Sequence, residues 1–214
     1  MKTNTEYSIK HLPLKRTFDI FFSIFCLIIL SPIFLVISIL ILFTSSGNII
    51  YSHERMGRGG KPFRCYKFRT MYLDADIRLA ELLKHDPQLL KEWQQTYKLK
   101  KDPRVTAIGN VLRKLSLDEL PQFWNVLRGD LSVVGPRPVV KEEFEKYFGT
   151  KGYKILSIRP GLTGLWQVSG RSDITCYHKR IQLDEYYVDN QSLLFDLQLI
   201  LKTIPVMLGQ KGAY

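Results

Sequence analysis

Two adjacent carboxylates, Asp118 and Glu119, are the residues whose types and spacing most directly suggest chemistry. Ser116 stands three residues before Glu119, the spacing of a capping box, so we expect both carboxylates to project from the first turn of a helix. The positive end of the helix dipole favours ionised carboxylates there. An ionised Asp beside a Glu suits phosphoryl chemistry with a divalent metal, although both residues are also common in ordinary first turns. Basic residues flank the pair closely, namely Arg113, Lys114 and Arg128.

The helix expected after Ser116 has an apolar and a polar face. The apolar residues recur at helical spacing, namely Leu117, Leu120, Trp124 and Leu127. A separate polar stripe is formed by Asp118, Gln122 and Asn125.

The composition favours an anionic partner. The 214-residue chain carries a formal net charge of +11, which suits nucleic acid, acidic lipid or a phosphorylated substrate. Its length allows one domain with a core and an appendage. The three cysteines have no CxxC spacing, so neither a disulfide framework nor a zinc site is supported, and a reducing cytosolic setting fits best.

An uncharged apolar run from Ile20 to Phe43 is long enough, at about 24 residues, to span a bilayer core as a helix. Ser31-Pro32 interrupts it, and proline kinks a helix. Basic residues lie on both flanks and prefer the cytoplasmic side, so a helix that bends at Ser31-Pro32 and returns through one leaflet fits better than a straight span. A cleaved signal peptide is the weaker reading, because the run exceeds the usual apolar region. We therefore divide the chain into a membrane segment, residues 1–47, and a cytoplasmic domain, residues 48–214.

The second segment reads as α+β and mostly helical. Short strands are expected at 48–53 and 62–68, around the glycine-rich loop Gly57–Gly60. Leu79, Leu82 and Leu83 should pack inward from the first of the helices. The last helix is apolar enough to be core, to lie at the membrane interface or to serve a homodimer. Helices are expected at 73–99 with a break at Pro87, and at 106–115, 139–148, 175–190 and 192–208.

Further cations lie where the sequence predicts a defined backbone: on a strand, between two prolines and in a tight loop. Lys67 alternates with Phe68 on the second strand, as expected at a half-buried edge. Arg137 stands between two prolines, a stiff mount for a guanidinium that can bind phosphate oxygens bidentately. Three glycines and a proline predict that residues 159–171 form a tight loop with no regular element, presenting Arg159, Gln167 and Arg171.

In their order along the chain, these motifs resemble the bacterial sugar transferases, the monotopic phosphoglycosyl transferases, from about Lys15 to Tyr214. No single motif is decisive, but the ordered set is specific, and the C-terminal residues resemble members that start exopolysaccharide or O-antigen repeats. The chain looks like a minimal catalytic form without the multi-span region of long members. The motifs are Lys15-Arg16-x-x-Asp19, Ser31-Pro32, Lys67-Phe68-Arg69-Thr70-Met71, Ser116 to Gln122, Gly135-Pro136-Arg137-Pro138 and Pro160 to Gly164.

The resemblance implies transfer of a sugar 1-phosphate from a UDP-sugar to undecaprenyl phosphate at the cytoplasmic face of the bacterial inner membrane, with release of UMP. It also implies that Asp118 is the nucleophile of a covalent phospho-sugar intermediate, and that Glu119, with Asp118, binds Mg²⁺. We expect Lys15 and Arg16 to meet the lipid phosphate, while Asp184 supports the metal or the sugar, or only a cap or salt bridge. The expected phosphate-binding and substrate-binding residues are Lys67, Arg69, Arg113, Arg137, Gln167 and Arg171.

Two other classes of function fit parts of the sequence. A basic, membrane-tethered protein that binds acidic lipid or nucleic acid would explain the charge, but no nucleic-acid motif occurs and no stacking aromatics alternate with the cations, so we expect no nucleic-acid partner. A structural membrane scaffold would leave the ordered glycine and arginine turns unexplained. The sugar, whether galactose, glucose or an N-acetylated sugar, is not readable from the sequence.

Overall fold

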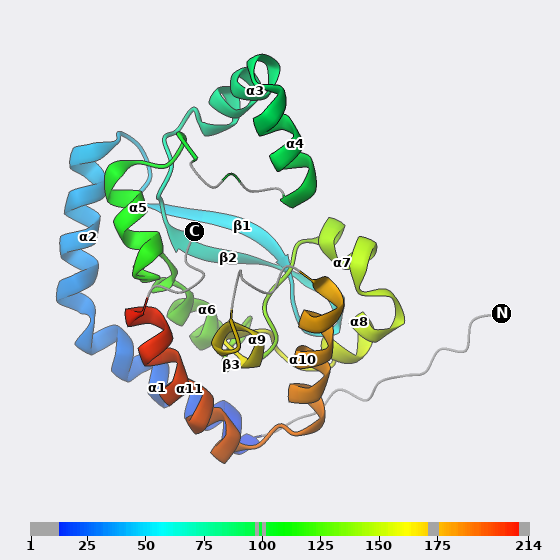
Figure 1. Cartoon of the computed structure of the whole chain (residues 1–214). Helices are drawn as coiled ribbons and strands as arrows, with labels where there is room; N and C mark the ends of the chain where they lie inside the picture. Colours follow the sequence, from blue (N-terminus) through cyan, green and yellow to red (C-terminus); the bar gives the residue numbers. More distant parts are fainter. Residues whose placement is uncertain (1–12, 97–98, 100–101, 171–175, 210–214) are drawn as a thin grey trace.

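The computed structural model describes residues 13–96, 99, 102–170 and 176–209. It is mostly helical with two small sheets, which confirms the α+β class (Figure 1). A bent pair of N-terminal helices runs along one side of the molecule, and only some of the other elements, among them the helices Ala107–Lys114 and Gln122–Arg128 and the strand Ser132–Val134, pack against it (Figure 1).

The helix pair consists of α1 (Pro13–Ile29) and α2 (Ser31–Thr44), which meet at a bend of 60°. The break falls at Ser31-Pro32 as predicted. Pro32 has no N–H to donate to the carbonyl oxygen of Ile28, one turn earlier, and the Ser31 hydroxyl donates to that oxygen instead, at 2.8 Å. The bend therefore leaves that carbonyl group satisfied.

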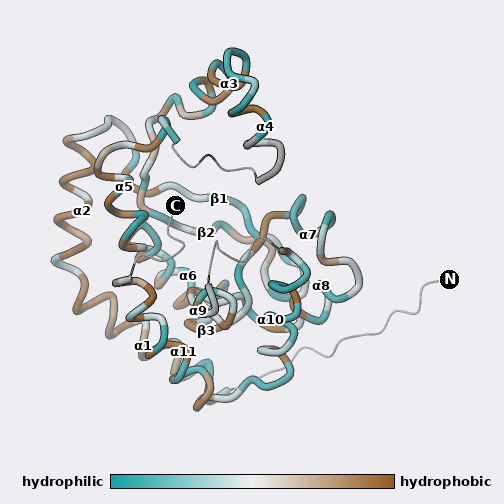
Figure 2. Tube along the Cα trace, in the orientation of Figure 1, coloured by the Kyte–Doolittle hydropathy of each residue, from teal (hydrophilic) through white to brown (hydrophobic). Residues whose placement is uncertain are grey.

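Many large apolar side chains of both helices are exposed. Figure 2 shows that most residues of α1 and α2 are hydrophobic. Among the described residues no single helix has the length and apolar character of a bilayer span, whereas α1 and α2 together do, by length and composition.

The inner face of α1 is attached to the rest of the molecule by Asp19. This carboxylate is 1% exposed, and its Oδ1 accepts hydrogen bonds from the Ser132 hydroxyl and the Val133 backbone N–H, both at 3.0 Å. A buried, directional contact of this kind fixes how the helix lies on the domain.

Two sheets of two strands each follow. β1 (Ile50–Met56) and β2 (Pro62–Phe68) form an antiparallel hairpin around η1 (Arg58–Gly60). This confirms the predicted hairpin, although its first strand begins two residues later and ends three residues later than expected. β3 (Ser132–Val134) and β4 (Gly161–Thr163) pair in parallel. The expectation that residues 159–171 hold no regular element is therefore wrong, since β4 and α9 (Leu165–Val168) both lie there.

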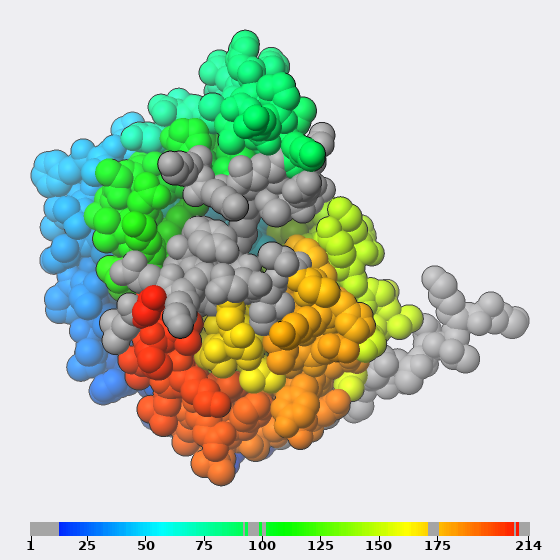
Figure 3. Space-filling model, viewed as in Figure 1, coloured from blue at the N-terminus to red at the C-terminus, as the bar shows by residue number. Residues whose placement is uncertain are grey.

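The predicted helical hairpin after the first sheet is present as α3 (Ala75–His85) and α4 (Pro87–Thr96), divided at Pro87. It projects beyond the hairpin of β1 and β2 (Figures 1 and 3). Leu79, Leu82 and Leu83 are only half-buried, because α3 packs on α4 and not on a core.

The other helices confirm the predicted segments within a few residues, except that α8 was missed. They are α5 (Ala107–Lys114), η2 (Leu117–Glu119), α6 (Gln122–Arg128), α7 (Lys141–Tyr147), α8 (Gly149–Ile155), α10 (Tyr177–Asp189) and α11 (Leu193–Leu208). One face of α11 is core, with Leu199 0% exposed, while Leu194 and Leu201 on the other face are 68% and 67% exposed.

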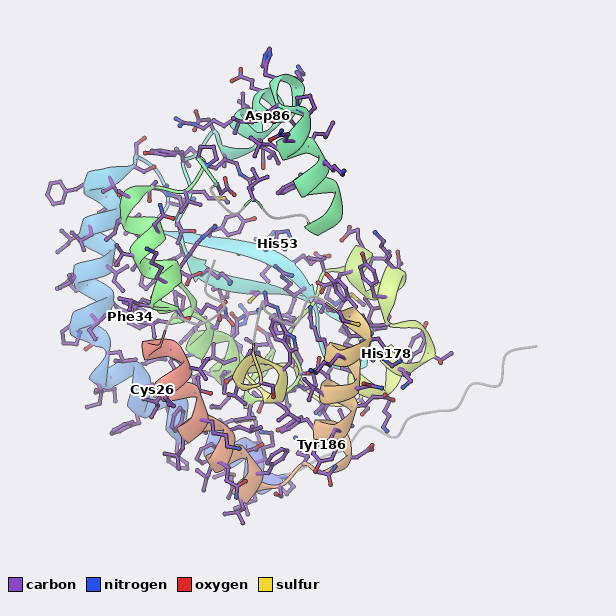
Figure 4. All side chains as sticks on the ribbon, in the orientation of Figure 1. Cys26, Phe34, His53, Asp86, His178 and Tyr186 are labelled. Atoms are coloured by element: carbon purple, nitrogen blue, oxygen red, sulfur yellow. The ribbon has the colours of Figure 1, made fainter. Side chains whose placement is uncertain are left out.

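One hydrophobic cluster joins the helix pair to the domain. Phe34 of α2 lies against Phe68 of β2 with ring centroids 5.3 Å apart, and Cys26 of α1 is partly buried in the same cluster (Figure 4). The buried members are Ile37, Ile41, Phe68, Leu112, Leu120 and Phe123. These residues place the chain around Asp118 directly against the inner face of α2.

Candidate active site

Asp118 and Glu119 lie in the single turn η2, between α5 and α6. Ser116 has a left-handed backbone (φ 55°) and its side chain caps nothing, so the predicted capping box is wrong. The longer helix begins only at Gln122, because the chain turns tightly through η2 to Pro121 before α6 starts. A tight turn thus holds the two carboxylates. They do not lie in the first turn of a longer helix, so no helix dipole favours their ionised forms.

Lys67 of β2 reaches both carboxylates. Its Nζ lies 2.5 Å from Glu119 Oε1 and 3.8 Å from Asp118 Oδ2. Burial lowers the pKa of Lys67, but Glu119 and Asp118 outweigh that effect and raise it above its ordinary value. The ammonium is therefore a permanent cation between two carboxylates.

Asp118 is 8% exposed, and this burial raises its pKa to about 6 although Lys67 opposes the rise. Arg113 of α5 also acts on Asp118 as a cation, and its Nε donates to the Thr70 hydroxyl at 2.9 Å. A carboxylate in this setting is ionised at neutral pH and poorly hydrated, which preserves its nucleophilicity.

Arg137 is a further cation of the site, in addition to Lys67 and Arg113. Its guanidinium carbon lies 5.1 Å from the ring centroid of Trp166, and its charge opposes the raised pKa of both Lys67 and Asp184. Pro136 and Pro138 flank Arg137, and the rigid mounting of its guanidinium stays a prediction. The described residues thus bring together Lys67, Arg113, Asp118 and Glu119, with Arg137 beside them.

Other predicted site residues lie elsewhere. Lys15 pairs with Asp196 at 2.6 Å, and Arg16 donates to the carbonyl oxygens of Val126 and Leu127 at 2.6 and 2.8 Å. Arg69 donates to the Ser45 carbonyl oxygen at 2.6 Å, at the end of α2. These contacts hold the helix pair against the domain, and the phosphate-binding roles of the three residues stay predictions.

Gln167, Asp184 and Arg171 complete the set. Gln167 is 9% exposed and its Oε1 has no hydrogen-bond partner, while Arg171 lies outside the described residues. Asp184 is 1% exposed with both oxygens unpartnered, and burial raises its pKa to about 7 against the opposing charges of Arg180 and Arg137.

Sequence reasoning missed several groups around the site. Arg55 of β1 lies close enough to Arg137 and Glu119 for their charges to shift its pKa, which burial lowers. Arg180 pairs with Glu143 at 2.6 Å beside Trp166. Only the spacing of four between Arg180 and Asp184 on one helix was a usable signal for this cluster.

The carboxylate pair fits the requirements of Mg²⁺. The described residues contain no group of three His, Cys, Asp or Glu side chains that could hold a metal alone. Mg²⁺ usually takes one or two protein carboxylates and completes its octahedron with water and substrate phosphates. Asp118 and Glu119 supply that number, and the cations around them would meet the phosphates.

A buried aspartate and a partly exposed glutamate among several cations, next to an apolar helix pair, define a site for phosphoryl chemistry. Comparison with known proteins identifies the group. The family described as bacterial sugar transferase matches residues 10–210, so the chain belongs to that family, and it is an enzyme of the phosphoglycosyl transferase class.

Several curated relatives match nearly the whole chain. The exopolysaccharide production protein ExoY of Sinorhizobium fredii is 50% identical over 94% of this chain and 88% of its own length. The undecaprenyl-phosphate galactose phosphotransferase of Salmonella typhimurium is 49% identical over 94% of this chain and 42% of its own length. The UDP-glucose:undecaprenyl-phosphate glucose-1-phosphate transferase of Klebsiella pneumoniae is 38% identical, over 94% of this chain and 41% of its length. The chain thus spans less than half of the latter two.

Proposed function

We propose that this protein transfers a sugar 1-phosphate from a UDP-sugar to undecaprenyl phosphate, the first membrane step in assembly of an exopolysaccharide, O-antigen or capsule. The observation that carries the proposal is the position of Asp118. Its Oδ2 lies 3.8 Å from Lys67 Nζ, and Arg113 is a second cation that acts on it. Its neighbours Leu117 and Leu120 pack in the same hydrophobic cluster as Ile37 and Ile41 of α2.

The proposed chemistry has two displacements at one phosphorus atom. Asp118 Oδ attacks the β-phosphorus of the UDP-sugar, and the bond to the bridging oxygen breaks, so UMP leaves with the electron pair. An oxygen of undecaprenyl phosphate then attacks the same phosphorus, and the acyl-phosphate bond breaks to restore the carboxylate. Splitting the transfer in this way lets a water-soluble donor and a lipid acceptor visit one carboxylate in turn.

The charged side chains around Asp118 have separate roles in the proposed transfer. Lys67 and Arg113 offset the negative charge that gathers on the phosphoryl oxygens, and Arg137 meets the diphosphate from its rigid mount. Glu119, with Asp118, would hold Mg²⁺, which when bound supplies further charge stabilisation at the phosphates. Burial of Asp118 limits access of water to the acyl-phosphate.

The topology proposed for the chain follows from the bend. The pair α1–α2 enters and leaves one leaflet of the inner membrane, and the catalytic domain lies on the cytoplasmic face, because basic residues flank both ends of the apolar run.

The test uses the full chain in detergent or nanodiscs with Mg²⁺, undecaprenyl phosphate and a panel of UDP-galactose, UDP-glucose and N-acetylated UDP-sugars. We expect UMP release with at least one donor, and covalent labelling of the protein by a donor labelled in the sugar. Asp118→Asn should abolish both signals, while Asp76→Asn, an exposed carboxylate on α3, should leave both unchanged. Full activity of Asp118→Asn would remove Asp118 from the nucleophile role.

A further inference from the structure

Asn125 is a buried polar residue that the mechanism above does not use. It lies on α6, is 0% exposed, and all three of its side-chain bonds stay inside the protein. Its Oδ1 accepts the Tyr66 backbone N–H at 3.0 Å, while its Nδ2 donates to the Arg64 carbonyl oxygen at 2.7 Å and to Asp130 Oδ2 at 3.0 Å.

These contacts reproduce those of a neighbouring strand. Within a strand, the N–H and C=O groups of residues i and i+2 point to the same edge, so Arg64 and Tyr66 present one acceptor and one donor away from β1. A carboxamide carries an acceptor oxygen and an NH2 group in one plane, so its oxygen and one of its two N–H groups can bond as a peptide group does. Asn125 therefore takes the place of a third strand at the outer edge of β2.

The hydrogen bond between Asn125 and the Tyr66 N–H lies next to the charged residues of the site. Lys67 directly follows Tyr66, and its ammonium group reaches Glu119 at 2.5 Å and Asp118 at 3.8 Å. Asn125 lies on the helix that begins three residues after Glu119. The carboxamide thus joins the strand that carries the cation to the helix that follows the carboxylates.

Apart from the Lys67 ion pairs and a hydrogen bond from Arg128 Nη1 to the Tyr66 hydroxyl at 3.3 Å, the other described contacts between these elements are apolar. Phe68 of β2 packs with Leu120 and Phe123, and such contacts have no preferred direction along a strand. Hydrogen bonds to both N–H and C=O fix the register, because the N–H and C=O groups of the adjacent residues point to the opposite edge and a slip of one residue would leave the carboxamide without these partners. The backbone carbonyl of Asn125 also accepts the N–H groups of Gly129 and Asp130, which holds the end of α6 rigid.

We propose that Asn125 is a positioning residue for the proposed transfer: its carboxamide sets the register between Lys67 and the Asp118–Glu119 pair. The inference rests on the proposed function. A displacement of the reacting groups by about 1 Å can cost about 100-fold in rate, so loss of this register should slow the chemical step more than it weakens donor binding.

The experiment is single-turnover labelling of the full chain with a sugar-labelled donor, comparing wild type with Asn125→Ala. We expect the labelling rate at saturating donor to fall by about 10- to 100-fold, while the labelled fraction at completion stays near that of wild type. A merely structural role would do the reverse, lowering the labelled fraction and the Tm but leaving the rate of the folded molecules unchanged. The matched control is Asn190→Ala, which removes an exposed carboxamide bonded to the Tyr186 carbonyl oxygen.

A single and a double variant distinguish loss of the register from misfolding. Asn125→Asp places a carboxylate oxygen against the Arg64 carbonyl and the Asp130 carboxylate, and Asn125→Asp with Asp130→Asn restores a donor to one of these contacts. We expect the double variant to label faster than the single one. Equal labelling rates for wild type and each folded variant would overturn the proposal.

Hydrogen exchange of the Tyr66 amide in the wild-type protein supplies a measurement that needs no variant and no activity. The proposal requires this amide to exchange as slowly as the core amides, and fast exchange would overturn it. If the wild type gave no labelling with any donor while the amide was protected, the proposed function would fail and the structural clamp would stand.

Discussion

Lys67 is the residue on which the electrostatics of the site depend. It is the one described cation within 4.0 Å of both Asp118 and Glu119. Without it, the two adjacent carboxylates would lose the cation that lies close to both, and the donor phosphates would meet more negative charge.

Replacing Lys67 with Met keeps an unbranched side chain that is only one atom shorter but removes the charge. We expect the rate of UMP release to fall by about 100-fold or more, because loss of one preorganised donor at a phosphoryl or oxyanion site typically costs that much. Lys84→Met removes an exposed cation on α3 and should have no effect. A Lys67→Met rate within a factor of three of wild type would show that the cation is dispensable.

Asp184 makes stability depend on pH. Burial raises its pKa to about 7, above the value near 3.9 of an unfolded aspartate. The folded state therefore binds the proton more tightly, so its contribution to stability is complete below about pH 4 and is lost as the pH rises to about 7. Above that pH the folded protein carries the cost of a buried, unpartnered carboxylate.

Asp184→Asn removes this titration while keeping the shape of the side chain. We expect the Tm of the variant, relative to that of wild type, to be higher at pH 8 than at pH 5, with thermal unfolding followed in one detergent. Asp189→Asn changes an exposed carboxylate at the end of the same helix and should shift both measurements equally. The same Tm difference at both pH values would contradict a buried, titrating Asp184.

At the scale of elements, the sequence identified short-range features well. The hairpin of β1 and β2, the break at Ser31-Pro32 and the division of α3 from α4 at Pro87 all follow from local turn and proline chemistry. The faces of α6 did not follow from spacing: Trp124 of the predicted apolar face is 55% exposed, while Gln122 and Asn125 of the polar stripe are 3% and 0% exposed. Their partners lie on β2 and elsewhere, far away in the sequence, so a polar pattern could not reveal an inward face.

The glycines near residue 160 were misread for a related reason. A Cβ on Gly161 would lie 2.0 Å from the Gly135 backbone nitrogen, so these glycines permit two strands to approach closely and do not form an irregular loop. The partner is 26 residues away in the chain, and only the fold shows it.

Gly161→Ala should therefore separate β3 from β4. We expect a loss of about 1 to 3 kcal/mol in stability, the usual cost of overfilling a packed interior, and a fall in activity because Arg137 follows Gly135 by two residues. Gly149→Asn is the control: its φ of +51° suits Asn, and no atom lies within 4 Å of the added Cβ. Wild-type stability of Gly161→Ala would show that the strands can move apart freely. Thermal unfolding and UMP release measure the two effects.

At the scale of the whole molecule, the candidate site lies where the helix pair meets the domain. The positive charge and the bent apolar pair were both readable from the sequence. Their connection was not, because Asp19, Lys15 and Arg16 attach α1 through residues more than 100 positions away, namely Ser132, Asp196 and Val126. Cations that looked free to bind lipid phosphate are engaged in holding the helix in place.

The bend between α1 and α2 depends on Ser31 and Pro32. Pro32 denies Ile28 its helical donor, and the Ser31 hydroxyl replaces it at 2.8 Å, so the two residues act as one unit. Replacing both with Leu restores the backbone donor and removes the substitute, which favours one continuous helix of about 32 residues, or about 48 Å, from α1 through α2. Such a helix is long enough to cross the bilayer.

We expect an N-terminal tag and the catalytic domain to be accessible from the same, cytoplasmic side in wild type, as measured by impermeant labelling of inverted vesicles and spheroplasts. In Ser31→Leu/Pro32→Leu the tag should become accessible from the opposite side, while Ile33→Leu should behave as wild type. A wild-type tag exposed on the outer side would mean that α1 and α2 cross the membrane despite the bend, and donor and acceptor would then have to meet Asp118 by a different route.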